Sequence, residues 1–169
     1  MKAYTSTTFV SPDEQVARLV SKAWMDEGIL LNAAFALAPH ETYLSVNRLS
    51  VESYNKDIKT FIKNHSDYQI ADKSDLYRRA LLVVGQINRI EVMNGDEILD
   101  VRVEVEPRDS HTKSHAGIFV RSKGQNIVHG REPLSGTLPA GVSSDAVLQE
   151  VRWQLLDIAE LQICKLVHD

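Results

Sequence analysis

The chain has 169 residues, of which 43% are hydrophobic and 25% are charged, and its net charge is −4 at pH 7. These are the proportions of an ordinary globular domain, and a chain of this length buries enough surface to fold without disulfides or structural metals. We therefore expect a single domain over residues 1–169. The sequence has no block of five or more lysines and arginines, which argues against a dedicated nucleic-acid or anionic-membrane binder.

Two further features bear on the cellular environment. Cys164 is the only cysteine, which excludes an internal disulfide, and we expect it to be a core or near-core thiol in a helix. No apolar segment of the kind found in signal peptides follows Met1. The longest apolar run, residues 29–38, is about half the length of a membrane span. We therefore expect a cytoplasmic protein without a membrane segment.

The first predicted helix begins at Ser11 and ends near Glu27. Ser11 at the N-cap, Pro12 in the first turn and Glu14 three residues after the cap form the pattern of a capping box. Apolar residues then recur at helical spacing. Gly28 can adopt the left-handed conformation that often follows the last turn of a helix.

The next segment predicts two strands and a second helix. The apolar run 29–38 indicates a strand buried on both faces, although its alanine-rich half is also compatible with a helix. Residues 43–48 predict another strand, and the two strands together could form a hairpin. Ser50 can cap a helix whose apolar residues, from Val51 to Ile62, lie on one face.

The middle of the chain predicts a short helix, a buried strand and a hairpin. Residues 76–79 are compatible with a helix, and the β-branched run that follows them, 80–84, is typical of a buried strand. The hairpin spans 90–105 around Asn94 and Gly95, because Asn-Gly tolerates the positive φ angles of a tight turn. Four polar residues alternate with its last apolar positions and are expected to face water, namely Asp100, Arg102, Glu104 and Glu106.

The last third predicts short strands at 116–120 and 127–129, an irregular loop over 130–141 and a final helix. Ser143 caps this helix, which continues toward Leu166. The order of elements does not alternate regularly between strand and helix. It therefore predicts an α+β fold, with an antiparallel or mixed sheet of five to seven strands and three helices packed mainly on one face.

Histidines are the first candidates for chemistry because imidazole titrates near neutral pH. His111 and His115 are four residues apart in a predicted loop. On a helix this spacing lets two imidazoles share a metal ion, but in a loop the spacing carries little information. Asp109, or His40 with Glu41, could complete a ligand set only if the loops meet. We therefore predict no metal site.

Other chemical signatures are weak. Cys164 and His168 would touch on a helix, although a terminal histidine more often stabilises the end of the helix than activates a thiol. The sequence has no nucleophile elbow, dinucleotide fingerprint or P-loop, so we predict no cofactor. The helix start at 141–144 and the side chain of Arg48 are candidate anion contacts, with capping and a salt bridge as their ordinary structural explanations.

Three segments together resemble a group of small bacterial proteins that share the pattern AF, then LSVxR, then HAxI. They are Asn32–Phe35, Tyr43–Arg48 and Ser114–Ile118, and the resemblance covers about residues 17–118. The resemblance implies no particular activity. An acidic residue often follows His-Ala in those proteins, whereas this chain has Gly117 at that position.

The resemblance implies that Ser45, Asn47, Arg48 and His115 belong to one region, and two hypotheses follow. The first, which we favour, is a non-catalytic binding or interaction module whose pocket includes these residues and His111, and whose partner is a protein or a small molecule. The second is a small enzyme that acts on a nucleotide-like or other anionic substrate. In that enzyme Arg48 would hold the anion and His115 would be the general acid or base.

Overall fold

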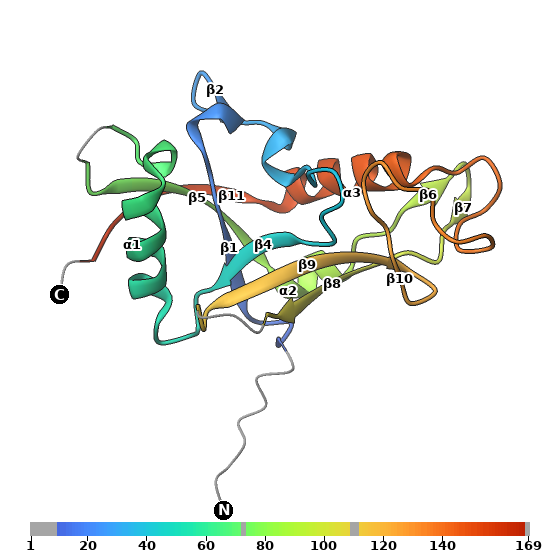
Figure 1. Ribbon diagram of the computed structural model, residues 1–169, viewed down its shortest axis with the longest axis horizontal. Helices are drawn as coiled ribbons and strands as arrows, with labels where there is room; N and C mark the ends of the chain where they lie inside the picture. The colour runs from blue at the N-terminus through green and yellow to red at the C-terminus, as the bar shows by residue number, and fades with distance from the viewer. Residues whose placement is uncertain (1–9, 72–73, 109–111, 168–169) are drawn as a thin grey trace, which may run out of the picture.

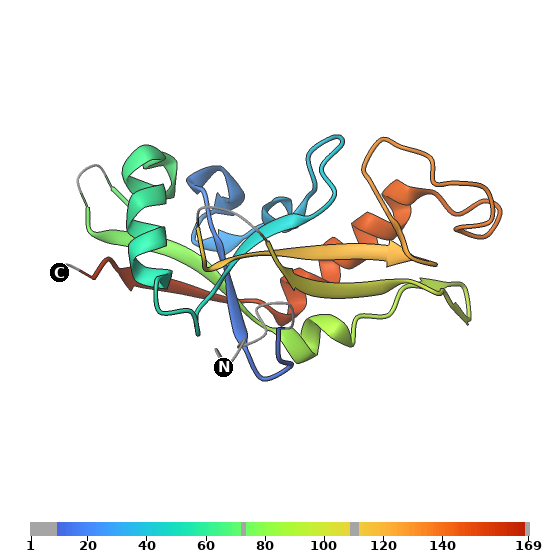
Figure 2. The same cartoon turned by 60° about the horizontal axis from the view of Figure 1, so that its bottom comes forward.

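The computed structural model describes residues 10–71, 74–108 and 112–167 (Figure 1). Seven strands in this part of the chain form one sheet, in which every paired neighbour is antiparallel. They are β1 (Gln15–Leu19), β4 (Leu44–Arg48), β5 (Leu76–Val83), β8 (Arg102–Pro107), β9 (His115–Ser122), β10 (Gln125–Asn126) and β11 (Glu160–Lys165). The strand order is β10-β9-β4-β1-β5-β11, and β9 also lies between β4 and β8 (Figure 2).

Helices and small hairpins complete the described part of the fold. The α-helices are α1 (Tyr54–Asn64), α2 (Val84–Asn88) and α3 (Ser144–Ile158). Short 3-10 helices are η1 (Lys22–Trp24), η2 (Asn32–Phe35) and η3 (Ser66–Tyr68). The two hairpins pair β2 (Met25–Asp26) with β3 (Ile29–Leu30) and β6 (Met93–Asn94) with β7 (Glu97–Ile98). The predicted α+β class, with five to seven strands and three helices, is confirmed.

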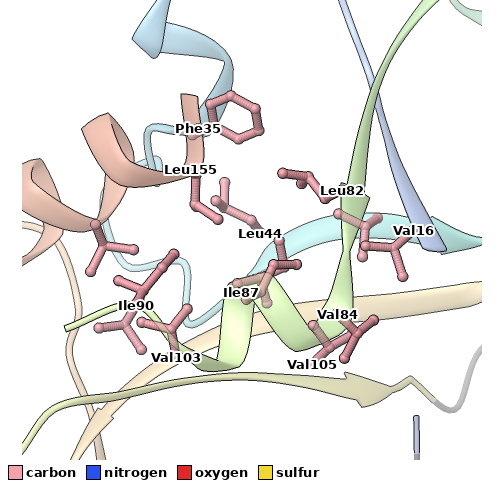
Figure 3. Packing of buried hydrophobic residues seen from close by; sticks show 14 of the residues in the cluster. Val16, Phe35, Leu44, Leu82, Val84, Ile87, Ile90, Val103, Val105 and Leu155 are labelled. Carbon is pink, nitrogen blue, oxygen red and sulfur yellow. The ribbon is translucent and has the colours of Figure 1, made fainter. Parts of the chain in front are cut away.

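The main hydrophobic core lies on the face of the sheet that α2 and α3 cover (Figure 3). Leu155 of α3 and Ile87 of α2 are fully buried and share this core with Leu44 and Leu82 from the strands. At about 25 cal/mol per Å² of apolar surface, each such side chain stabilises the fold by roughly 1.5–3 kcal/mol. This core gives the sheet a rigid base, so the side chains on its opposite face are held in fixed positions.

A second, smaller core lies on that opposite face, where α1 packs. Ile58 and Ile62 of α1 are buried against Ala17 and Tyr77 of the sheet. The helix predicted from Ser50 is thus confirmed, but it begins later. The reason is that the Ser50 hydroxyl donates a hydrogen bond to Glu14 at 2.5 Å and does not cap the helix.

The predicted helix from Ser11 to Glu27 is wrong, because the segment contains β1. The expected turn does form: the Ser11 N–H donates to the Glu14 carboxylate at 2.8 Å. The chain then enters the middle of the sheet, where β1 pairs with β4 and β5. Consecutive apolar residues such as Val16 and Ala17 are buried on opposite faces of β1. A strand that is buried on both faces has no two-residue period of apolar residues. The spacing of the apolar residues in β1 was therefore also compatible with a helix.

The predicted strand over residues 29–38 is also wrong. Only Ile29 and Leu30 are in a strand, β3, and the chain then forms η2. Ile29 is 66% exposed, whereas Ala34 and Phe35 are buried in the main core. One end of this apolar run is therefore exposed to solvent, and another part is buried in the core. The predicted hairpin with residues 43–48 does not form. The strand at 43–48 itself is confirmed as β4.

Two further boundaries differ from prediction. Residues 76–79 are extended and belong to β5, and the helix α2 follows the strand instead of preceding it. The last helix begins as predicted at Ser143, whose hydroxyl accepts the Ala146 N–H at 3.1 Å, but it ends at Ile158. Cys164 therefore lies in β11, where it is half-buried against the second core. Residues 160–165 pair with the edge of β5, and the chain therefore does not continue as a helix after Ile158.

The Asn-Gly hairpin is confirmed in part. Gly95 has a φ of 63° in the turn, and β6 and β7 pair over two residues each. Beyond them the chain diverges, and β8 pairs with β9. Arg102 is exposed, and Glu104 and Glu106 are half-exposed, as expected for one open face of the sheet.

Candidate functional site

A cavity of about 700 Å³ lies between α1 and the sheet. Its walls come from β1, β4, α1, η3 and the start of β9. The lining residues are Arg18, Leu19, Ser45, Asn47, Ser53, Lys56, Asp57, Thr60, Phe61, Asn64, His65, Tyr68, Thr112, Lys113 and His115. A cavity of this size can hold a ligand of a few tens of atoms.

Three of the predicted site residues lie together at this cavity. In the antiparallel register Asn47 is opposite His115, and Ser45 is opposite Gly117. Paired residues and residues two apart share a face of a sheet, so Ser45, Asn47 and His115 all point to the side of α1. Ser45 Oγ and His115 Nε2 are 2.6 Å apart.

A polar network joins the first turn of α1 to the two strands. The Ser114 hydroxyl donates to Asp57 Oδ2 at 2.7 Å, and the Ser114 N–H binds the same oxygen at 3.1 Å. The Ser53 hydroxyl also donates to this oxygen, and Asn47 Nδ2 donates to Ser114 Oγ at 2.9 Å. Asp57 is thereby occupied in fixing the helix to the sheet.

Three cations line the cavity. Arg18 lies where β1 and β4 diverge, since the two strands pair only at Val16 and Ala17. Its Nε donates to the carbonyl of Ala34 and its Nη1 to the carbonyl of Ser45, both at 2.9 Å. Lys56 and Lys113 are exposed, and neither forms an ion pair within the described ranges. In a protein with a net charge of −4, the described part of the lining carries these three cations and one carboxylate, Asp57, which makes it locally positive.

Aromatic rings form another part of the wall. Phe61 and His65 stack with 4.2 Å between their ring centroids, and Tyr68 meets Phe61 edge-on at 5.1 Å. His65 Nδ1 donates to the carbonyl of Phe61 at 2.9 Å, which fixes the orientation of the imidazole. Trp24 packs edge-on against Tyr68 at 6.1 Å, and Arg18 lies over the Trp24 ring.

The environment of His115 favours its neutral form. Burial lowers the pKa of His115, and the positive charge of Arg108 lowers it further. The Tyr43 ring lies 5.9 Å from the imidazole, and Arg108 stacks over Tyr43 at 4.7 Å. Near pH 7 the imidazole can therefore accept a proton.

No protein-family model, curated protein or solved structure matches the chain. Function must therefore be inferred from the site itself. Among the described residues, no group of three or more histidine, cysteine, aspartate or glutamate side chains is placed to hold a metal ion. None of the described helices is long and apolar enough to cross a membrane.

Arg48 is not among the described residues that line the cavity, which separates it from the predicted site. Its guanidinium binds Glu14 through Nε and Nη2, at 3.0 and 2.9 Å to Oε1, and both side chains are largely buried, with 13% and 14% exposed. Only the backbone of Arg48 approaches the site, since its N–H donates to the carbonyl of Ser114. His111, which was predicted to bind a ligand, lies outside the described residues, as do Asp109 and His168.

Sequence reasoning missed the cations and the aromatic wall. Lys56 lies outside the apolar face of the helix predicted from Ser50 and was not singled out, and Arg18 was assigned to a helix that does not exist. The pair Phe61 and His65 carried a usable signal, because residues four apart on a helix can stack. No local sequence pattern indicates that Lys113 lines a site, because the hydrogen bond between Ser114 and Asp57 is what brings Lys113 to α1.

Proposed function

We propose that the protein binds a small anionic ligand that carries a flat ring, and that mononucleotides are the class that fits. The observation that carries this proposal is the presence of three cations and an aromatic wall in one cavity. Phosphate groups bind to guanidinium and ammonium groups, and bases stack on aromatic rings. This develops the favoured hypothesis of a binding module whose partner is a small molecule.

The spacing along α1 supports the same class. Lys56 lies in the first turn, and Asp57 beside it is bonded to Ser114, the neighbour of Lys113. Phe61 lies five residues after Lys56, so the helix rises about 7.5 Å between them. This rise is the component of their separation along the helix axis, and because both residues line the same cavity, a ligand as long as a mononucleotide can reach from one to the other. One ligand could therefore contact both lysines with its phosphate and Phe61 with its base.

Isothermal titration calorimetry with AMP, GMP, CMP and UMP tests the proposal, with adenosine and inorganic phosphate as the two half-ligands. At least one mononucleotide should bind, and each half-ligand should bind at least about tenfold more weakly, because each forms only one of the two contacts. If no mononucleotide binds at millimolar concentration, the proposal is wrong.

Two lysines on α1 provide a matched pair of variants. Lys56 lines the cavity, whereas Lys63, on the same helix, is exposed and is not among the lining residues. Lys56→Ala should weaken mononucleotide binding by about 10–100-fold, since a charge-assisted hydrogen bond contributes about 1.5–3 kcal/mol. Lys63→Ala should leave it unchanged. An equal effect of both variants would show that only the overall charge matters and would contradict a specific site.

A further inference from the structure

We propose that Ser45 is a nucleophile and His115 its general base, and that together they cleave phosphodiesters. This inference rests on the proposed function, since the same cavity would hold the substrate. It differs from the enzyme hypothesis formed from the sequence, which gave His115 no nucleophilic partner and made Arg48 the anion anchor. The structure instead brings Ser45 to the imidazole and leaves Arg48 bound to Glu14.

The geometry of the pair is that of an activated hydroxyl. Ser45 Oγ and His115 Nε2 are 2.6 Å apart, within the range for proton transfer from a nucleophile to its base. Both residues are on neighbouring strands of a sheet whose other face is a packed core. Rigid strands hold such a pair in place more accurately than loops do. The low pKa of His115 keeps a neutral imidazole available as the base.

Stability does not require this hydrogen bond. Ser45 is exposed, so water could satisfy its hydroxyl without the imidazole. Ser114, in contrast, is fully buried and bonded to Asp57, which is the arrangement expected of a structural serine. The difference between the two serines favours a chemical role for Ser45.

The charges around Ser45 favour phosphorus as the electrophile. Arg18 donates to the backbone carbonyl of Ser45 and lines the same cavity, as do Lys56 and Lys113. A phosphodiester is an anion, and negative charge on its oxygens must be stabilised as the hydroxyl attacks. Asp57, the carboxylate in the lining, has one oxygen bonded to three donors from Ser53 and Ser114. These donors are neutral, so Asp57 keeps its negative charge, and the three cations of the described lining outnumber it.

The reaction has two balanced steps. Ser45 Oγ attacks phosphorus, the bond from phosphorus to the leaving oxygen breaks, and the hydroxyl proton passes through His115 Nε2 to the leaving alcohol. Water then attacks the phosphoryl group on Ser45, and His115 takes a proton from the water. The bond to Ser45 Oγ breaks, and His115 returns the proton to that oxygen. The net change is the hydrolysis of a phosphodiester to a monoester and an alcohol, with no oxidation or reduction.

The test uses the full chain and bis(4-nitrophenyl) phosphate, an anionic diester with aromatic rings. Release of nitrophenolate should be observed with the native protein. It should fall at least about a hundredfold in Ser45→Ala and in His115→Gln, because general-base catalysis contributes about 10²–10⁴-fold. Ser135→Ala and His129→Gln are matched controls outside the cavity and should retain the rate. Mass spectrometry of protein quenched in acid should find a nitrophenylphosphoryl group on Ser45.

Three results would overturn the inference. If mononucleotides bind but the diester is not cleaved, the dyad is not catalytic and the proposed binding function stands. If Ser45→Ala keeps the native rate, Ser45 is not the nucleophile. If the phosphoryl group is found on another residue, the assignment is also wrong. Calorimetry on Ser45→Ala, with the mononucleotide that the native protein binds, distinguishes a lost nucleophile from a misfolded protein.

Discussion

Replacement of Gly117 by alanine should destabilise the protein mainly through contact with the Tyr43 ring. A Cβ atom at this position would lie 2.6 Å from Cδ2 and 2.9 Å from Cγ of the Tyr43 ring, and 3.0 Å from Phe119. Carbon atoms in contact are normally about 3.5–4.0 Å apart, so the Tyr43 ring would have to move by about 1 Å. Gly117 therefore has a packing role, and a larger residue such as an acidic one would not fit beside Tyr43.

The magnitude follows from two opposed effects. Overpacking of this kind costs about 1–3 kcal/mol. Gly117 is not among the glycines with positive φ, so alanine also reduces the entropy of the unfolded chain and stabilises by about 0.4–1 kcal/mol. We therefore expect Gly117→Ala to lower the free energy of unfolding by about 1–2 kcal/mol. Urea denaturation measures this change, and the slope of the transition should remain that of the native protein.

A double-mutant cycle with Tyr43→Ala identifies the cause. Once the Tyr43 ring is removed, the new methyl group of Gly117→Ala has space, and its cost should disappear or change sign. Because Tyr43 lies beside His115, the single variant should also shift the NMR signals of that imidazole. If Gly117→Ala costs the same with and without Tyr43, the contact does not explain the effect and the reasoning is refuted.

Three other predictions concern the salt bridge, the imidazole and the core. Burial alone would raise the pKa of Glu14, but its bonds to Ser50, Ser11 and Arg48 lower it overall. Arg48→Met should lower the free energy of unfolding by about 1–3 kcal/mol near pH 7, as measured by urea denaturation. This loss should become smaller as the pH falls below about 4, because Glu14 is then protonated. A loss that does not change with pH would contradict the prediction. The pKa of His115, measured by NMR, should lie below its ordinary value of about 6.5, so protonation of His115 should lower the stability of the protein as the pH falls below that value. Arg108→Gln should raise the pKa of His115. An unchanged pKa would remove Arg108 as a cause. Leu155→Ala should lower the free energy of unfolding by about 2–5 kcal/mol, and a smaller loss would mean that the core collapses around the space.

The parts of the fold that the sequence predicted well have one exposed face. α1 has buried residues such as Ile58 and Ile62 on one side and exposed lysines on the other, so its helical period is visible. The sequence predicted helix for the segments that form β1 and β11. β1 is buried on both faces, and β11 lies at the edge of the sheet. Their apolar residues do not alternate, and only the neighbouring strands decide that they are extended. That information is not local in the sequence.

Of the candidate site, too, the sequence predicted only a part. The resemblance predicted that Ser45, Asn47 and His115 belong to one region, and in the structure they lie at one cavity on the paired strands β4 and β9. Arg48 was grouped with them by the same resemblance, but its side chain binds Glu14, which also accepts the Ser11 N–H. The cationic and aromatic walls depend on where α1 docks on the sheet, and no local pattern encodes that docking.

The walls of the cavity come from segments that are far apart along the chain, from Arg18 to His115. The unfolded chain cannot assemble this binding surface, so any ligand of the cavity binds the native state alone. By mass action, a ligand at a hundred times its Kd adds about 2.7 kcal/mol to the free energy of unfolding. For a domain of this length that raises the melting temperature by about 5–10 °C. A melting-temperature screen of a metabolite library would therefore rank ligands before any reaction is known.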